Sequence, residues 1–283
     1  MGFFRRERID GKSREQLRRM RAAGLVVAET LVLTRERAVP GITTKELDTL
    51  AEEHIRSAGA TPSFLGYHGF TGTICASVNE EIVHGIPGTR VLAEGDLISI
   101  DCGAIVDGWH GDAAVSFVVG GREAGREEDL SLIDATEESL YAGIAALAVG
   151  RSLFEVGAAV EDAILAAGRR DQRVYGIVED YVGHGIGTAM HMDPQVPNYR
   201  CREKGPLVVD GTTVAIEPMV TLGDQANEVL ADDWTVVTLD KSRAAHWEHT
   251  VAATSEGLWI LTALDGGAAK LAEIGAPFAP LAD

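Results

Sequence analysis

The sequence predicts an α+β fold in which two pseudo-symmetric halves form one domain. The order helix, helix, strands occurs twice along the 283 residues. The halves also align: with an offset of 116, Gly95–Asp101 matches Gly211–Glu217, and each segment ends in a carboxylate. No linker rich in Pro, Gly or Ser separates the halves, so one two-lobed domain is favoured over two independent domains.

Two helices are predicted at the start of each half. Leu17, Met20, Val27 and Leu31 recur with a helical period, and Thr43/Thr44 followed by Glu46 is typical of the start of a second helix that ends at Gly59. Helical periods return at about 128–147 and 153–168.

Strands are predicted where β-branched and apolar runs are bounded by Gly and Asp. In the first half these runs are Ile74–Val78, Leu97–Val106 and Ala113–Val119. In the second half they are Thr212–Val220, Thr235–Leu239, Thr250–Thr254 and Trp259–Thr262. We therefore expect a domain over 1–264, with halves at about 14–125 and 126–262, followed by a loosely packed C-terminal tail over 265–283.

Composition argues against several classes of protein. Only three cysteines occur, without a CxxC pair, so a disulfide framework is not expected. No run of about 18 apolar residues is present, and the first residues lack the apolar stretch of a secretory signal. We therefore expect a cytoplasmic protein that does not enter membranes. The formal net charge of −18 argues against DNA as a partner.

Basic side chains are concentrated at the N-terminus. Residues 1–21 hold eight Lys and Arg side chains against three acids. This segment could dock on the ribosome, although the solvated face of a first helix would explain the same charges.

Four carboxylates and one histidine form the main candidate site. Asp101 and Asp112 flank a strand, turn, strand pattern that could bring them together, and Glu217 and Glu248 adjoin apolar strands of the second half. His184 lies in a glycine-rich segment. Taken singly, each residue has an ordinary structural explanation. As a set, however, buried carboxylates are unfavourable unless they are paired, protonated or bound to metal.

The composition of this set favours a pair of divalent metal ions. Four carboxylates and one imidazole suit Mn, Fe or Co better than a purely structural Zn. Two ions about 3.5–4 Å apart can activate a bridging water near neutral pH, which indicates hydrolase chemistry.

At these residues the sequence resembles the methionine aminopeptidases, which belong to the M24 metallopeptidases with the pita-bread fold. The resemblance covers roughly residues 14 to 262 and consists of six motifs in family order: Asn79–Pro87, Asp107–Asp112, Gly183–Gly187, His191 with Pro194–Val196, Ile216–Met219 and Trp247–Thr250. It implies a curved antiparallel sheet covered by helices.

The resemblance also implies roles for individual residues. Asp101, Asp112, His184, Glu217 and Glu248 would hold two divalent ions (Co, Mn, Fe or Zn), between which a hydroxide is the nucleophile. His84 and His191 would hydrogen-bond the scissile amide, and Glu217 would also transfer a proton. The substrate would be the free N-terminus of a nascent polypeptide, from which the initiator methionine is removed when the second residue is small.

A methionine pocket follows from the same resemblance. Its wall would consist of Tyr67, Phe70, Cys75, His84, Met190 and Trp234, together with Phe64. Phe64 and Met190 depart from the best-known bacterial pattern, which has Cys and Phe at these places. Because of these two differences, the resemblance does not predict how wide the pocket is.

Two alternatives remain at this stage. An Xaa-Pro peptidase of the same fold would need the same ligands, but such enzymes usually carry a large additional N-terminal domain. A non-catalytic binding protein of this fold would have lost ligands, whereas all five are present here. The short interval between His191 and Glu217 favours the first type of methionine aminopeptidase, which we expect to be a monomer. The remaining histidines, including His110, His246 and His249, are assigned to ordinary loop or strand packing.

Overall fold

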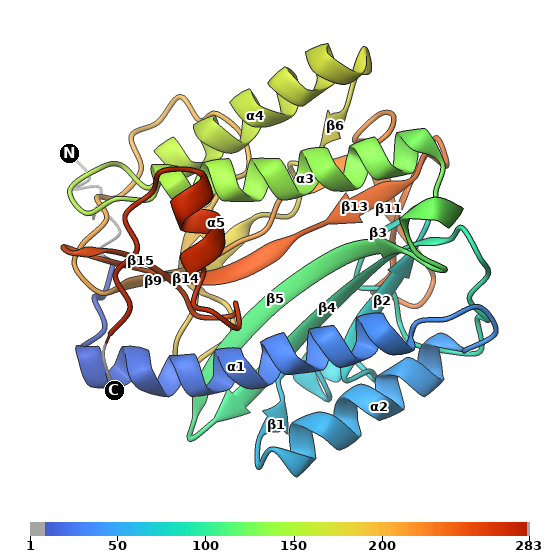
Figure 1. Ribbon diagram of the computed structural model, residues 1–283, viewed down its shortest axis with the longest axis horizontal. Coiled ribbons are helices and arrows are strands. Elements are labelled where there is room, and N and C mark those ends of the chain that lie inside the picture. The colour runs from blue at the N-terminus through green and yellow to red at the C-terminus, as the bar shows by residue number, and fades with distance from the viewer. Residues whose placement is uncertain (1–8, 282–283) are drawn as a thin grey trace.

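The computed structural model describes residues 9–281, in which a long curved sheet carries two large helices over each half (Figure 1). Both first-half helices begin with a capping box, formed by Ser13 with Gln16 and by Thr43 with Glu46. None of the described helices has the length and apolar character needed to span a bilayer. The four large helices are α1 (Arg14–Arg37), α2 (Thr44–Ser57), α3 (Glu127–Ala146) and α4 (Glu155–Asp171).

The main sheet has nine strands within the described residues. Its path is β1, β4, β5, β14, β9, β7, β8, with β2 beside β4 and β15 beside β14. The first-half strands are β1 (Thr61–Pro62), β2 (Ile74–Val78), β4 (Leu97–Val106) and β5 (Trp109–Val118). The second-half strands are β7 (Gly183–Gly185), β8 (Met192–Val196), β9 (Thr212–Ile216), β14 (Glu248–Thr254) and β15 (Gly257–Ile260).

Two three-stranded sheets and two short 3-10 helices complete the regular structure of the described residues, and one of the sheets pairs β3 of the first half with β12 of the second. One sheet has the order β13, β10, β6 and the other β11, β12, β3. Their strands are β3 (Glu81–Val83), β6 (Gly176–Ile177), β10 (Met219–Thr221), β11 (Asn227–Val229), β12 (Val236–Thr238) and β13 (Ala244–His246). The 3-10 helices are η1 (Tyr67–Gly69) and η2 (Arg122–Ala124). Most of these strands could not be predicted from the sequence, because two or three residues are too few to show a period in hydrophobicity.

The predicted hairpin between β4 and β5 is confirmed. The two strands pair from Leu97↔Val118 to Val106↔Trp109. Asp107 and Gly108 form the turn with φ of 49° and 79°, the left-handed conformation that a tight two-residue hairpin requires. β5 therefore begins at Trp109 and not at the predicted Ala113.

The predicted strand Thr212–Val220 is divided in the structure. β9 ends at Ile216 and β10 begins at Met219, so that Glu217 and Pro218 lie between two strands of different sheets. Pro218 has no backbone N–H and cannot donate to a strand ladder, which explains the break at this point. The break leaves Glu217 outside the regular pairing.

The two halves meet along the centre of the main sheet. β5 pairs with β14 at Ala113↔His249 and Ala114↔Glu248. On either side of this junction the order is the same, with β4 next to β5 and β9 next to β14. The aligned Gly95 and Gly211, which precede β4 and β9, both have left-handed backbone, with φ of 84° and 80°. Equivalent turns thus introduce equivalent strands.

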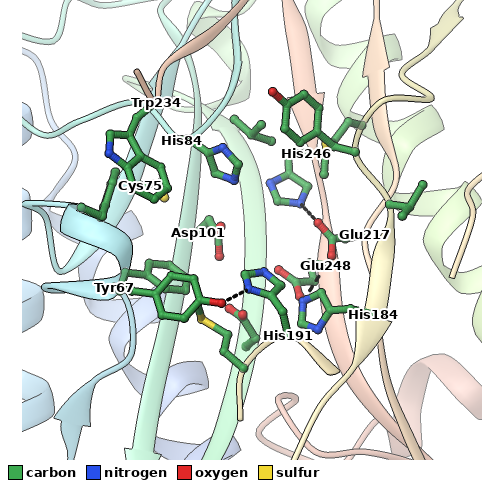
Figure 2. A pocket seen from close by; sticks show the side chains of 18 residues that line it. Tyr67, Cys75, His84, Asp101, His184, His191, Glu217, Trp234, His246 and Glu248 are labelled. Atoms are coloured by element: carbon green, nitrogen blue, oxygen red, sulfur yellow. Dashed lines mark hydrogen bonds and ion pairs between the residues drawn. The ribbon is translucent and has the colours of Figure 1, made fainter. Parts of the chain in front are cut away.

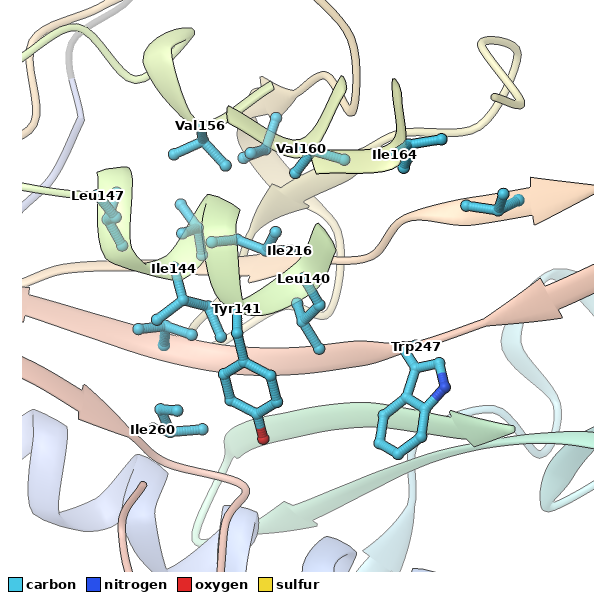
Figure 3. Packing of buried hydrophobic residues seen from close by; sticks show 14 of the residues in the cluster. Leu140, Tyr141, Ile144, Leu147, Val156, Val160, Ile164, Ile216, Trp247 and Ile260 are labelled. Atoms are coloured by element: carbon cyan, nitrogen blue, oxygen red, sulfur yellow. The ribbon is translucent and has the colours of Figure 1, made fainter. Parts of the chain in front are cut away.

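The helices fix the strands that carry the candidate site. Gly143 of α3 packs so closely on α4 that a Cβ there would lie 2.7 Å from Cγ2 of Val160 and 3.4 Å from Cγ2 of Ile216. Figure 3 shows Leu140 and Ile144 of α3 beside Ile216. Ile216 is the residue before Glu217, so this layer of side chains sets the end of β9.

The C-terminal tail is packed against the body of the protein, and the expectation of a loose tail is wrong. It contains α5 (Ala268–Glu273), whose Leu271 is fully buried, and Leu281 is also buried. Leu258 of β15 donates its N–H to Pro277 (2.8 Å) and accepts from Ala279 (2.9 Å). Ala, Gly and Pro make up most of the tail, so the sequence alone gives little indication of this packing.

The basic N-terminal segment is partly structural. Arg21 donates to the backbone carbonyls of Leu261 (2.7 Å) and Leu264 (2.8 Å), and its guanidinium lies over the Trp259 ring. Arg14 forms an ion pair with Glu256. These two side chains hold α1 to the end of the second half. Three of the eight basic residues lie outside the described residues: Arg5, Arg6 and Arg8.

Candidate metal centre and adjoining cavity

The strand register places the two first-half carboxylates on one face of the sheet. Asp101 pairs with Ala114, and Asp112 precedes Ala114 by two residues on the same strand. Side chains two residues apart on a strand point to the same face, so Asp101 and Asp112 are diagonal neighbours. Asp101 lies inside β4, whose bounds agree with the predicted strand, and Asp112 lies inside β5, which begins four residues before the predicted Ala113.

The second half adds three side chains to the same face. Glu248 pairs with Ala114 across the junction of the halves, so it shares the face of Asp101 and Asp112. His184 of β7 pairs with Ala215 of β9, and Glu217 follows Ala215 by two residues. Figure 2 shows Asp101, His184, Glu217 and Glu248 directed toward one another.

Three of the five candidates are close enough to hold one ion. Ligand atoms of Asp112, His184 and Glu248 lie within 4.8 Å of one another, and all three residues are buried. Nε2 of His184 lies 3.4 Å from Oε1 of Glu217. Nδ1 of His184 lies 3.0 Å from the carbonyl oxygen of Gly185, to which it donates in the tautomer that leaves Nε2 as a ligand.

Burial makes the carboxylates reluctant to ionise without a cation. It raises the pKa of Asp101 to about 7. Burial together with the neighbouring carboxylates raises the pKa values of Asp112, Glu217 and Glu248 well above their ordinary range. Burial also lowers the pKa of His184 to about 4, which keeps its imidazole neutral. Metal binding requires a neutral imidazole and ionised carboxylates, so a cation that binds here must displace protons from the carboxyl groups.

Unpartnered polar atoms indicate what this cluster is built to hold. Oδ1 of Asp101, Oδ1 of Asp112 and Oε1 of Glu248 are buried and have no hydrogen-bond partner among the described residues. Leaving such acceptors unsatisfied costs about 1–3 kcal/mol each, and more for charged groups. Oxygen-rich ligands with one imidazole suit divalent Mn, Fe or Co. The residues present therefore fit a divalent cation.

The carboxylates line one side of a cavity of about 160 Å³, and apolar side chains line the other. Phe64, Phe70, Cys75 and Met190 are buried in its wall, with Tyr67 and Trp234 packed beside them. The Phe70 ring meets Trp234 edge to face at 5.1 Å and Phe64 at 6.5 Å. Cys75 pairs with Asp101 across β2 and β4, which joins the apolar wall to the carboxylates. All the pocket residues expected from the sequence lie together here.

His84 and His191 lie on opposite sides of the cavity (Figure 2). His84 follows β3 with φ of 60°, and its ring contacts Trp234 and Tyr181 edge to face. Burial and the charge of His191 lower the pKa of His84 to about 4. Nδ1 of His191 lies 2.9 Å from the Tyr67 hydroxyl. Both imidazoles can thus present an N–H to a molecule in the cavity.

Sequence reasoning missed five residues of the wall, of which two are polar, His246 and Tyr181, and three are apolar, Val83, Val182 and Met219. The assignment of His246 to ordinary strand packing is incomplete, because its ring faces Glu217 from above the carboxylates (Figure 2). Its position two residues before Glu248 could have indicated a shared face. His249, by contrast, faces away from the cavity and contacts Tyr141 and Thr262.

Comparison with known proteins agrees with this arrangement. The model of metallopeptidase family M24 matches residues 18–255, and the chain belongs to that family. Within it, the chain is 55% identical to "Methionine aminopeptidase 1" of Mycobacterium tuberculosis over 255 residues, which cover 90% of this chain and 95% of the relative. A methionine aminopeptidase structure from Thermotoga maritima superposes with a TM-score of 0.85 at 39% identity and covers 90% of this chain and 99% of its own.

The likeness extends more weakly to other members of the fold. Prolidase from Pyrococcus furiosus has a TM-score of 0.67 at 20% identity, with 89% of this chain and 64% of the prolidase covered. At that identity the likeness shows the fold alone. The α+β pita-bread fold with two pseudo-symmetric halves is thereby confirmed.

Proposed function

We propose that this chain is a methionine aminopeptidase that removes the initiator methionine from nascent polypeptides. The observation that carries the proposal is the cavity itself, in which an apolar wall lies directly beside five candidate metal ligands. The chain spans nearly the full length of its methionine aminopeptidase relatives, which supports the same activity here.

Asp101, Asp112, His184, Glu217 and Glu248 would together hold two divalent ions. Two such ions, when bound, supply the Lewis acidity that makes water a nucleophile near neutral pH. Four carboxyl groups on one face support two ions better than one, because one ion would leave a net negative cluster. Mn, Fe, Co and Zn are all candidates.

The other steps of the proposed reaction depend on protein side chains and not on the metal ions. His84 and His191 would donate hydrogen bonds to the scissile amide and to the oxygen on which charge develops. Glu217 would accept a proton from the nucleophile and deliver it to the departing amine. The peptide's free α-amine would be recognised at the metal side of the cavity, which would restrict cleavage to the chain terminus.

The apolar wall would select methionine. An unbranched thioether fits among Phe70, Trp234 and Tyr67, because sulfur and aromatic rings attract each other. Met190 and Cys75 add two polarisable side chains to the same wall. Burial and the nearby Asp101 and Asp112 carboxylates raise the pKa of the Cys75 thiol well above its ordinary range, so it acts as an apolar neighbour.

Partners and location follow from the same proposal. Nascent N-termini would be the substrates, and the preference for a small second residue, the monomeric state and the cytoplasmic location stay predictions. Docking of residues 1–21 on the ribosome is a further prediction. Replacement of Arg5, Arg6, Arg18 and Arg19 by Ala should reduce cosedimentation with ribosomes.

The decisive experiment is hydrolysis by metal-stripped protein that is re-supplied separately with Mn, Fe, Co or Zn. The substrates are Met-Ala-Ser, Ala-Pro and N-acetylated Met-Ala-Ser. We expect release of methionine from the free tripeptide alone, with a rate that ranks the metals. Cleavage of Ala-Pro would instead assign the protein to the Xaa-Pro peptidases, and inactivity with bound metal would indicate a binding protein.

A further inference from the structure

His246 has a buried polar atom that the proposed roles leave unused. The residue is 2% exposed and lines the cavity at the end of β13. Its Nε2 is buried and has no hydrogen-bond partner among the described residues. An unsatisfied buried ring nitrogen is unfavourable, so a partner is expected in the working protein.

The backbone of His246 is held in place by the first half of the molecule. Its N–H donates to Oγ of Ser116 (2.9 Å), and its carbonyl accepts from the same hydroxyl (2.8 Å). Ser99 of β4 contacts Ser116 of β5 at 2.7 Å between their Oγ atoms. These two buried serines hold the backbone of His246, and therefore the point from which its imidazole extends, in one position.

Glu217 lies between two imidazoles. Its Oε1 is 3.4 Å from Nε2 of His184, and its Oε2 is 3.8 Å from Nε2 of His246. Met219, two residues after Glu217, pairs with His246 across β10 and β13. The strand pairing therefore brings the unpartnered nitrogen and the second carboxylate oxygen together from opposite sides. A shift of less than about 1 Å would bring them to hydrogen-bond distance.

We propose that His246 is a positioning residue that donates its Nε2–H to Oε2 of Glu217 and so keeps Oε1 directed toward His184. The proposal rests on the proposed function, because it assigns to Glu217 both metal binding and proton transfer. Glu217 lies outside regular strand pairing at the break before Pro218, so its backbone alone does not fix the carboxylate. A donor on the far oxygen supplies that restraint.

Three substitutions of His246 test whether an N–H is needed at the position of Nε2. His246→Gln keeps an N–H near the position of Nε2, His246→Asn keeps a polar side chain that is too short, and His246→Leu removes the donor. His54→Leu is a matched control on α2, because Nε2 of His54 is likewise buried without a hydrogen-bond partner and lies 3.7 Å from a glutamate, Glu29, outside the cavity.

The measurements are the Mn²⁺ affinity of metal-free protein by calorimetry, and kcat and KM for Met-Ala-Ser. We expect His246→Gln and His54→Leu to stay within about threefold of the unchanged protein. His246→Asn and His246→Leu should lose about 10- to 100-fold in Mn²⁺ affinity and in kcat, with KM changed less than about threefold. Thermal unfolding shows which variants are folded.

Two results would overturn the proposal. In the first, Gln and Asn behave alike, so that the reach of the donor does not matter. In the second, folded His246→Leu binds Mn²⁺ and turns over substrate like the unchanged protein. If the unchanged protein hydrolyses no peptide, the proposed function fails, whereas the order of Mn²⁺ affinities among the variants still tests His246.

Discussion

The buried carboxylates of the site are compatible with a stable fold only when they act together. Asp112 and Glu248 are each almost fully buried, and the charged groups that raise their pKa values are other carboxylates of the site. An isolated buried carboxylate would either stay protonated or destabilise the fold. Their joint presence around one imidazole therefore indicates a ligand role for each.

Asp112→Asn should abolish turnover, because the change removes a negative charge from the proposed metal ligands. Loss of residues that merely support ligands costs about 10- to 100-fold, so loss of a ligand should exceed about a hundredfold in kcat. Asp107→Asn is the control, since Asp107 is exposed in the same hairpin and Asn also adopts its left-handed backbone. Full activity of Asp112→Asn with normal metal content would rule out the two-metal assignment.

The stability of the metal-free protein should fall as pH rises from about 6.5 to 8. Folding raises the pKa of Asp101 to about 7 and those of the other site carboxyls well above their ordinary range, whereas an unfolded chain releases these protons near pH 4. The folded state then binds more protons than the unfolded state, so stability decreases with pH.

The buried histidines confine this effect to the upper range. The pKa values of His84, His184 and His249 are lowered to about 4, and that of His246 to about 3. Between about pH 4 and 6.5 the protons that the unfolded chain binds on these four histidines therefore offset the protons that the folded state keeps on the four carboxyl groups, and stability changes little. Above pH 6.5 only the carboxyl effect remains. Thermal unfolding should give a falling Tm for metal-free protein and a flat Tm with Mn²⁺; a flat profile without metal would contradict the raised pKa values.

At the level of elements, the close contact of α1 with the sheet determines how the halves are joined. Gly24 faces the end of the second half, where a Cβ would lie 2.1 Å from the carbonyl oxygen of Leu261. Gly111 of β5 approaches the same point, and its Cβ would lie 2.8 Å from the backbone nitrogen of Gly24. These two glycines let the helix cross the strand that carries Asp112 at backbone distance.

Gly24→Ala should destabilise the protein although alanine favours helices. The helix gains about 1 kcal/mol in propensity, but a methyl group against backbone forces α1 to move, and overpacking costs typically about 1–3 kcal/mol. We expect a net loss of about 1 kcal/mol in urea unfolding. Ala22→Ser, on the exposed side of α1, should change stability by less than about 0.5 kcal/mol. A stabilised Gly24→Ala protein would refute the close contact.

Over the whole molecule, the C-terminal tail ties the two halves together. Leu271 belongs to the core beneath α3, and Leu281 packs with Leu17 and Met20 of α1. Lys270 of the tail also lies 3.8 Å from Glu137 of α3. The chain end therefore closes the side of the domain where the first helix and the last strands meet.

Leu271→Ala tests this role. A buried Leu→Ala change typically costs about 2–5 kcal/mol, and Ile274→Ala, on the same segment but 38% exposed, should cost much less. Urea unfolding of the metal-loaded proteins measures both. Equal small losses would mean that the tail is loosely packed, as its composition suggests.

The sequence by itself determined the helices, the long strands and the ligand set. Capping boxes and apolar periods are local properties, so α1, α2 and the β4–β5 hairpin could be predicted within a few residues. The five candidate ligands and the pocket wall were predicted because ordered motifs resemble a known family. The repeat was visible because Gly95 and Gly211 introduce equivalent strands with the same turn.

Only the tertiary structure decided the remaining features, because they depend on contacts between segments far apart in the chain. The break at Glu217 separates two strands that belong to different sheets. His246 becomes part of the cavity through Ser116 of the other half, some 130 residues away. The tail is held to the domain by two separate apolar side chains, since Leu271 packs in the core beneath α3 and Leu281 packs against α1. No local pattern records such pairings, since each partner alone has an ordinary sequence context.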